Sequence, residues 1–328
     1  MHTRTALIAA LLLAACAAQA PAQDTPLVAP IEQTPAQSEA PSAPDGQAIP
    51  ASYPEGPLWR GTKLYYAEMG ADRISVWEHG QTHPFFTLAG CGPTAIAPYG
   101  PGFLVLCHIG AFIVAIEADG QELRRWTEDD AGVALRDPND GYEDGVGGVY
   151  FSDPGLFSRE TRPQGRVMHL TASGALTSVA SPLWYPNGVY TDIPHHKLYV
   201  DEHMAGRVLK YDIAADGSLH NQTTFVDINA VHRPARYGTP YPETGPDGLE
   251  MGPDGDMFVS IYGEGRILRF SPQGAFVGMI ELPTRYSTNI AFNDAGDAAT
   301  TGSFINDEPP FPGEVRFHPA ASLTRRGG

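Results

Sequence analysis

The chain of 328 residues carries 21 Lys and Arg against 38 Asp and Glu, a formal net charge of −17. Such an acidic surface repels phosphate backbones, so nucleic acid is not an expected partner. Hydrophobic residues make up 42% of the chain, which is enough for a sizeable core and argues against wholesale disorder. The 36 Gly and 30 Pro predict many turns between short elements, and the three Cys contain no zinc-binding pair pattern.

Residues 1–15 have the pattern of an export signal. A short basic start precedes an apolar run over 6–15 that is too short to span a bilayer. The run ends in Leu-Ala-Ala-Cys at 13–16, which resembles a bacterial lipobox and implies lipidation of Cys16. The alternative is an ordinary signal cleaved after Ala20. We therefore expect an exported protein that is lipid-anchored in the cell envelope facing the periplasm, or soluble in the periplasm, and that contacts the membrane only through the anchor.

The segment that follows is poor in residues that could pack. Residues 16–48 are rich in Ala, Pro, Gln and Ser, a composition typical of a flexible tether. We expect the folded domain over 49–320 and a flexible tail over 321–328.

From residue 52 onward, apolar residues do not recur at helical spacing. Short alternating or β-branched runs recur instead, and turn dipeptides such as Asp-Gly separate them. These runs cover 64–67, 74–77, 103–106, 112–116, 149–151, 197–200, 208–211, 257–260 and 267–270. The pattern predicts an all-β protein.

The runs also group into a longer repeat. Candidate first strands begin near Glu55, Pro93, Asn139, Asn187, Asp247 and Thr288. Six units of about 45 residues predict a six-bladed β-propeller with four-stranded blades, whose closure removes exposed edges. The alternative, an open β-sandwich, does not explain six similar units. Residues 289–319 supply only three strands, so we expect a segment just before Glu55 to complete the sixth blade.

Four of the six units place a carboxylate or an amide where the first strand begins. These residues are Glu55, Asn139, Asn187 and Asp247. Each lies beside a Pro or Gly, and Asn and Asp also favour tight turns for purely structural reasons. In a propeller, however, equivalent positions gather at one mouth of the central tunnel. Two carboxylates and two amide oxygens suit one divalent metal, Ca²⁺ first, with Zn²⁺, Mn²⁺ or Mg²⁺ as alternatives.

Several short stretches together resemble a known family. They are 55–59, 137–140, 148–154, 185–188, 245–249, 265–267 and 287–292. In this order the chain resembles the SMP-30/gluconolactonase/LRE-like proteins over about 55–319. The resemblance implies a propeller with one divalent metal that hydrolyses lactones. It further implies Glu55, Asn187 and Asp247 as metal ligands, Asn139 as a fourth ligand or substrate contact, and Asp247 as the general base.

The implied chemistry suits such a site. A metal ion polarises the lactone carbonyl and stabilises the oxyanion, and a nearby carboxylate takes the proton of the attacking water. One carboxylate cannot readily serve as both a tight ligand and a free base, so the identity of the base stays open. Some lactonases of the family carry an Arg two residues before the third-blade Asn, where this chain has Asp137. Arg136, one position further back, is a candidate substrate contact, and the departure disfavours gluconolactone-like substrates.

Other residues have two interpretations each. His108 and His203 follow second strands and are candidate bases or substrate contacts, or else exposed turn histidines. The segment 229–243 is a lid over the mouth or a surface loop. Cys91 and Cys107 flank a predicted hairpin and form either a disulfide worth on the order of 3 kcal/mol or two free thiols.

The expected activity is that of a metal-dependent lactonase or carboxylic-ester hydrolase acting on a small molecule, in a monomer. The same metal site could instead hydrolyse aryl esters or phosphotriesters. A third hypothesis is a non-catalytic binding propeller with a structural ion.

Overall fold

The computed structural model describes residues 46–158, 162–232 and 244–323. The predicted signal peptide, the lipidation site Cys16 and nearly all of the tether lie outside the described residues. Most of the predicted tail and most of the 229–243 segment also lie outside them. Within the described ranges, no helix is long and apolar enough to cross a membrane.

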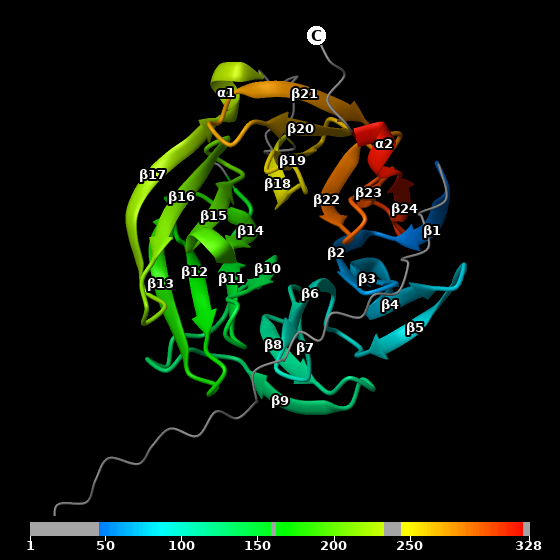
Figure 1. Cartoon of the computed structure of the whole chain (residues 1–328). Helices are drawn as coiled ribbons and strands as arrows, with labels where there is room; N and C mark the ends of the chain where they lie inside the picture. Colours follow the sequence, from blue (N-terminus) through cyan, green and yellow to red (C-terminus); the bar gives the residue numbers. More distant parts are fainter. Residues whose placement is uncertain (1–45, 159–161, 233–243, 324–328) are drawn as a thin grey trace, which may run out of the picture.

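The strands form six antiparallel four-stranded sheets, arranged as blades around a ring (Figure 1). This confirms the predicted all-β, six-bladed propeller. The blades, each from the axis outward, are β2 (Pro54–Arg60), β3 (Lys63–Glu68), β4 (Arg73–Glu78) and β5 (Gln81–Thr87); β6 (Pro93–Tyr99), β7 (Gly102–Cys107), β8 (Phe112–Ile116) and β9 (Glu122–Trp126); β10 (Gly141–Glu143), β11 (Val149–Asp153), β12 (Gly165–Leu170) and β13 (Leu176–Leu183); β14 (Pro186–Asp192), β15 (Lys197–Glu202), β16 (Arg207–Ile213) and β17 (Leu219–Asp227); β18 (Gly245–Met251), β19 (Met257–Tyr262), β20 (Arg266–Phe270) and β21 (Phe276–Glu281); and β22 (Tyr286–Phe292), β23 (Ala298–Ser303), β24 (Pro312–His318) and β1 (Ala48–Ser52).

The sixth blade joins the two ends of the folded chain. The first strand, β1, pairs with β24, so that Ala48 lies opposite Arg316 and Ser52 lies opposite Pro312. The prediction that a segment before Glu55 supplies the missing strand is confirmed. Because the first and last strands share one sheet, the ring cannot open without breaking a ladder of hydrogen bonds.

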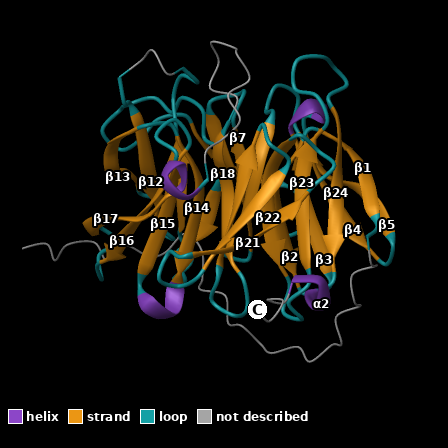
Figure 2. Ribbon diagram, turned by 90° about the horizontal axis from the view of Figure 1, so that it is seen from above, coloured by secondary structure: helices purple, strands orange, loops and turns teal. Residues whose placement is uncertain are grey.

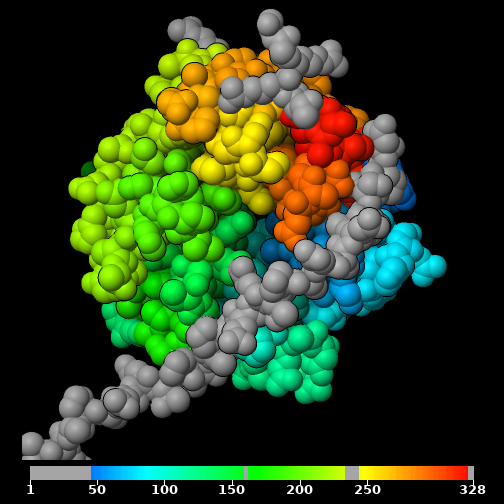
Figure 3. Space-filling model, in the orientation of Figure 1, coloured from blue at the N-terminus to red at the C-terminus, as the bar shows by residue number. Residues whose placement is uncertain are grey.

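The blades pack side by side around the ring (Figure 3). The hydrophobic core consists of separate clusters, each between two neighbouring blades. Between blades two and three, for example, Leu104 and Leu106 belong to the same cluster as Phe151 and Met168. Most residues of the inner and middle strands are buried, whereas most residues of the outermost strands are exposed or half-buried. Apolar runs without strict alternation are therefore expected at the centre of each blade.

The helices are single turns: η1 (Met69–Ala71), η2 (Ile193–His195), α1 (Ile228–Val231) and α2 (Ala320–Leu323). We call the end of the ring where the inner strands begin the mouth. In Figure 2 the longer loops gather at the mouth, at the opposite end from α2. All four candidate metal ligands precede or begin inner strands, so the fold brings them to the mouth.

Candidate metal centre

The inner strands are irregular at the mouth. In five blades the pairing with the second strand shifts register there, between Glu55 and Leu58, Pro93 and Ala95, Pro186 and Val189, Pro246 and Leu249, and Ser287 and Asn289. Such bulges bend a strand and redirect its side chains. Asn187 and Asp247 lie within the bulged segments, and Glu55 lies at the edge of one. The irregularity frees these side chains from the alternating pleat of the sheet.

Glycine follows three of the four candidate ligands, at positions where neighbouring inner strands approach closely. A Cβ atom on Gly56 would lie 2.4 Å from the carbonyl oxygen of Thr94 in the next blade. A Cβ atom on Gly188 would lie 2.3 Å from the carbonyl oxygen of Asp247. Any side chain at either position would push the blades apart at the axis.

In three blades, an acidic residue at the end of the second strand binds the backbone ahead of the candidate ligand. Its carboxylate accepts a hydrogen bond from the N–H group three residues before that ligand. The pairs are Ser52 with Glu68 (2.9 Å) before Glu55, Arg136 with Asp153 (2.9 Å) before Asn139, and Trp184 with Glu202 (2.7 Å) before Asn187. Each carboxylate also forms an ion pair with an arginine of the third strand, namely Arg73, Arg166 or Arg207. The three loops therefore share one positioning device.

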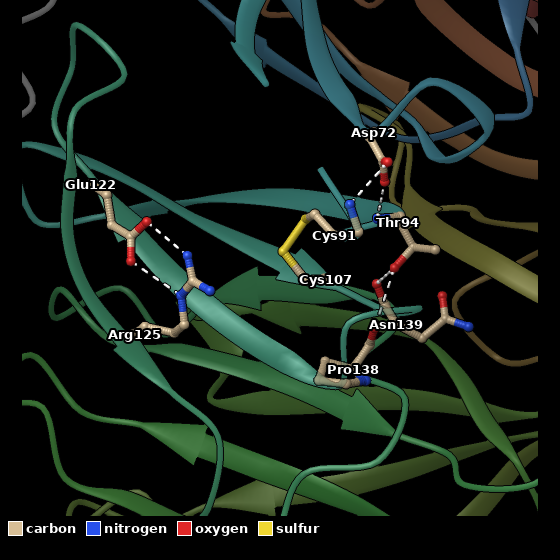
Figure 4. Close-up of a disulfide and its surroundings, with 10 residues drawn as sticks. Asp72, Cys91, Thr94, Cys107, Glu122, Arg125, Pro138 and Asn139 are labelled. Atoms are coloured by element: carbon tan, nitrogen blue, oxygen red, sulfur yellow. Dashed lines mark hydrogen bonds and ion pairs between the residues drawn. A yellow bond between two sulfur atoms is a disulfide. The ribbon is translucent and has the colours of Figure 1, made fainter. Parts of the chain in front are cut away.

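Hydroxyl groups of neighbouring strands fix the carbonyl groups of the same loops. Thr94 donates to the carbonyl oxygen of Asn139 (2.8 Å; Figure 4). The other two bonds run from Ser152 to the carbonyl oxygen of Asn187 (2.6 Å) and from Thr288 to that of Pro54 (2.8 Å). These bonds fix the main chain at or beside three of the four candidate ligands.

The result is one cavity of about 210 Å³ at the mouth. Glu55, Asn139, Asn187 and Asp247 all line it, and each is between 4% and 7% exposed. The structure thus brings together four side chains that are far apart in the sequence and come from four different blades.

The two carboxylates of the cavity are electrostatically strained. Burial raises the pKa of Glu55 well above its usual range, and the charges of Asp247 and Asp140 raise it further. Burial and the charge of Asp140 likewise raise the pKa of Asp247, although a hydrogen bond from the Asn187 side chain opposes this shift. A bound cation would stabilise both ionised carboxylates.

A second feature suits a cation. The Asn187 side-chain oxygen is buried and has no hydrogen-bond partner among the described residues. An amide oxygen next to two buried carboxylates is the kind of donor that Ca²⁺ and Mg²⁺ accept. Within the described ranges no three His, Cys, Asp or Glu side chains group as a metal site. A cation at this cavity therefore requires the amide oxygens as well as Glu55 and Asp247.

His108 and His203 also line the cavity, so neither is an exposed turn histidine. The Nδ1–H of His108 donates to the carbonyl oxygen of Asp137 (3.2 Å), and that of His203 donates to Pro246 (2.9 Å). Because a carbonyl oxygen only accepts, the proton lies on Nδ1 in both rings. Burial lowers the pKa of His108, which favours its neutral imidazole.

Arg136 does not line the cavity. Its guanidinium donates to the carbonyl oxygen of Gln164 (2.9 Å), and its side chain is exposed. The prediction of a substrate contact at this position receives no support from the structure. The physical reason is that the backbone of Arg136 is bound by Asp153, which leaves the side chain outside the mouth.

Several lining residues were not predicted. Tyr53, Phe157, Tyr185 and Tyr262 form much of the wall. Two of them had a usable signal, because Tyr53 and Tyr185 occupy the same place in the repeated pattern Tyr-Pro-(Glu or Asn)-Gly. Asp201 of β15 was not predicted either. Its carboxylate accepts a hydrogen bond from the N–H of Gly188 (3.0 Å), the residue that follows the candidate ligand Asn187.

A disulfide joins Cys91 and Cys107 near the mouth end of blade two (Figure 4). Of the two alternatives left open by the sequence, the structure contains the bonded pair. Cys107 directly precedes His108, so the bond fastens the backbone beside a lining residue.

Residues 53–301 match the family model of the SMP-30/Gluconolactonase/LRE-like region. A curated relative, lactonase drp35 of Staphylococcus saprophyticus, is 29% identical over 203 residues, which cover 59% of this chain and 57% of the relative. Lactonase drp35 of Staphylococcus aureus strain MRSA252 is 29% identical over 202 residues, with the same shares. The match with this chain thus spans less than two thirds of the length of these curated relatives.

Solved structures share the fold. A luciferin-regenerating enzyme aligns with a TM-score of 0.65 at 18% identity, covering 83% of this chain and 95% of that one. A gluconolactonase from Xanthomonas campestris aligns with a TM-score of 0.65 at 22% identity, covering 84% and 91%. A calcium-binding regucalcin from Agrobacterium tumefaciens strain C58 aligns with a TM-score of 0.61 at 15% identity, covering 83% and 92%. Because the family model matches well over half of the chain, the protein belongs to the SMP-30/gluconolactonase/LRE-like family.

Proposed function

We propose that this protein is a metal-dependent hydrolase that opens lactones or related carboxylic esters. The observation that supports the proposal is the convergence of Glu55, Asn139, Asn187 and Asp247 on one buried cavity. The relatives named lactonase and gluconolactonase support the reaction class.

We infer that one divalent cation binds at this cavity, with Ca²⁺ the first candidate because all of the donors are oxygens. Glu55, Asn187 and Asp247 would hold it, and Asn139 would be a fourth ligand or a substrate contact. When bound, the cation supplies Lewis acidity for an ester carbonyl. The calcium-binding neighbour of the same fold supports this choice of metal.

Two lining groups can take the proton of an attacking water. Asp247 is a carboxylate, but its role as a ligand removes lone pairs from proton transfer. Burial favours the neutral imidazole of His108, the form that can accept a proton. A base within the cavity sets the acidic limb of the pH profile of kcat/KM. His108→Gln should abolish that limb if His108 is the base, and leave its midpoint unchanged if Asp247 is.

The test of the proposed function uses the purified mature protein. We expect about one divalent metal per chain by elemental analysis, hydrolysis of members of a lactone and ester panel, and loss of hydrolysis on chelation that the metal restores. Asn187→Leu should remove both metal and activity while the β-sheet circular dichroism is retained. One bound metal with no hydrolysis across the panel would contradict the enzyme and favour a binding propeller with a structural ion.

We further propose that the chain works outside the cytoplasm, anchored through Cys16. The signal pattern over 1–15 supports export, and so does the Cys91–Cys107 bond, because disulfides persist in oxidising compartments. Labelled palmitate should be incorporated by the wild-type chain and not by Cys16→Ser, which should appear in the soluble periplasmic fraction. An unprocessed chain in the cytoplasm would contradict this proposal.

A further inference from the structure

We propose that the mouth cavity selects uncharged lactones that carry an apolar alkyl or aryl substituent, and that it discriminates against polyhydroxylated lactones. This inference rests on the proposed function and names the substrate class of the same site. It follows from the residues that line the cavity together with the oxygen ligands.

One side of the cavity is built from ring systems in mutual contact. We call Tyr53, Phe157, Tyr185, His203 and Tyr262 the aromatic wall; all five line the cavity. Ring centroids lie 4.9 Å apart for Phe157 and Tyr185, 5.2 Å for Phe157 and His203, and 6.0 Å for His203 and Tyr262. A continuous surface of this kind binds apolar groups.

Two of the three tyrosine hydroxyl groups of the aromatic wall are hydrogen-bonded within the protein. The hydroxyl groups of Tyr53 and Tyr262 bond to each other at 2.7 Å. The Tyr262 hydroxyl also accepts from the side-chain amide of Asn306 at 2.9 Å. A sugar lactone would have to desolvate several hydroxyl groups against rings that offer them few partners, which is costly.

The charges of the cavity also favour an uncharged substrate. Of the described residues that line it, none is Lys or Arg. Arg136, which the sequence offered as a candidate substrate contact, donates to the carbonyl oxygen of Gln164 and does not line the cavity. The cavity thus offers an anionic substituent no cationic side chain from the described part of the chain.

The aromatic wall is fixed by the backbone. Tyr53 and Tyr185 have φ angles of 47° and 52°, in the left-handed region that is uncommon for bulky residues. Residues held in this region concentrate at functional sites, where the surroundings enforce them. Here Glu68 and Glu202 bind the N–H groups of the residues just before each tyrosine. Both rings are therefore held over the cavity by the same device that positions the ligands.

Exposed apolar residues neighbour the lining residues in the sequence. Ile109 and Leu156 are 66% and 63% exposed and directly adjoin the lining residues His108 and Phe157. Phe304 and Ile305 are 41% and 38% exposed, and they precede the asparagine that bonds to Tyr262. Each of the four is thus within two residues of a lining residue or of the asparagine that bonds to one.

The test is a series of δ-lactones hydrolysed by the full mature protein with its metal. The series runs from δ-valerolactone through alkyl derivatives of increasing length, with glucono-δ-lactone as the polyhydroxylated comparison. We expect kcat/KM to rise up to about fourfold per methylene over the first members, the value of burying one methylene completely. Glucono-δ-lactone should lie below δ-valerolactone.

A matched pair of variants assigns the preference to the aromatic wall. Phe157→Ala should flatten the dependence of kcat/KM on chain length. Phe276→Ala removes the same side chain from the outer strand β21, where it is 39% exposed, and should keep the wild-type slope. Melting curves and metal content establish that both variants are folded and loaded. A slope in Phe157→Ala equal to that of the wild type would overturn the role of the wall.

The remaining outcomes separate this inference from the proposed function. Lactone hydrolysis with a flat series, or with glucono-δ-lactone as the best substrate, overturns the inference and leaves the hydrolase in place. Alkyl lactams of the same ring size measure binding by calorimetry without turnover. Lactam affinity that rises along the series, with no hydrolysis of any lactone, overturns the hydrolase and keeps the ligand class; affinity that does not rise overturns the ligand class.

Discussion

Two acidic cavities lie along the ring axis, and they differ in how their oxygens are satisfied. The mouth cavity holds about 210 Å³, and a second cavity of about 220 Å³ lies further along the tunnel. Asp140, Tyr142, Glu143 and Glu250 are among the residues that line the tunnel cavity. Acidic residues and size alone therefore do not distinguish the two.

Hydrogen-bond donors do distinguish them. In the tunnel, Asp140 accepts from the N–H groups of Gly141 (2.9 Å) and Val189 (3.2 Å), and Glu250 accepts from that of Phe292 (3.4 Å). At the mouth, Glu55 and Asp247 also receive hydrogen bonds, but the Asn187 side-chain oxygen has no partner among the described residues. The buried Asn187 oxygen is therefore an unused donor for a cation beside two carboxylates, whereas Asp140 and Glu250 already accept from backbone N–H groups. We therefore expect the metal at the mouth and not in the tunnel.

The largest expected effect comes from removing one carboxylate from each cavity. Asp247→Ala should lower kcat/KM by more than about 100-fold and release the metal, because it deletes a ligand. Glu250→Gln changes the tunnel only and should keep both metal and activity. The metal content and kcat/KM of the two variants are measured side by side. Loss of the metal from Glu250→Gln, with the metal retained in Asp247→Ala, would contradict the assignment of the metal to the mouth.

The disulfide near the mouth should contribute to the stability of the fold. Cys91 and Cys107 enclose a sequence separation of 16 residues, and a bond closing such a loop stabilises by about 3 kcal/mol. Replacing both by Ala should lower the free energy of unfolding in urea by about that amount. Unchanged stability would show that the bond does not contribute to the fold.

Metal binding should stabilise the mouth directly. At free metal of about 100 times Kd, binding contributes about 2.7 kcal/mol, which raises Tm by roughly 5 °C. Glu55→Gln should lose most of this rise because it removes one ligand charge. A full rise in Glu55→Gln would place the cation elsewhere.

The smallest effect is a pH dependence that originates in the tunnel. Burial raises the pKa of Glu250 to about 8, so the folded chain retains a proton that the unfolded chain releases above about pH 4.5. The folded state is therefore destabilised as pH rises from about 4.5 to 8. Between pH 5 and 8, Tm should fall further in the metal-bound wild type than in Glu250→Gln, because the variant has no carboxyl group to ionise at this position. Equal slopes would contradict the raised pKa.

The repeat made much of the molecule predictable. Six similar units, each beginning with a turn, indicate both the ring and the equivalence of Glu55, Asn139, Asn187 and Asp247. The missing strand of the last unit likewise predicts closure by β1. Local spacing suffices for these features because each blade is built from chain that is contiguous or nearly so.

Features that depend on contacts between segments distant in the sequence were not predictable. Phe157 and Tyr262 reach the cavity from loop and strand ends that share no repeated pattern. Arg136 turns away because Asp153, in the neighbouring strand, binds its backbone. The interaction of the second-strand acids with the loops requires the register of strands that are not adjacent to those loops in the sequence.

The closing strand has a mechanical consequence. Only Tyr53 and Pro54 separate the end of β1 from Glu55, so the latch of the ring and the first oxygen donor are consecutive in the chain. Tension applied at the amino-terminal end would act on β1 before it reached any blade interior. A protease cut before Ala48 would release the propeller with all six blades intact. Separation of β1 from β24 would instead open the ring and displace Glu55 at the same time.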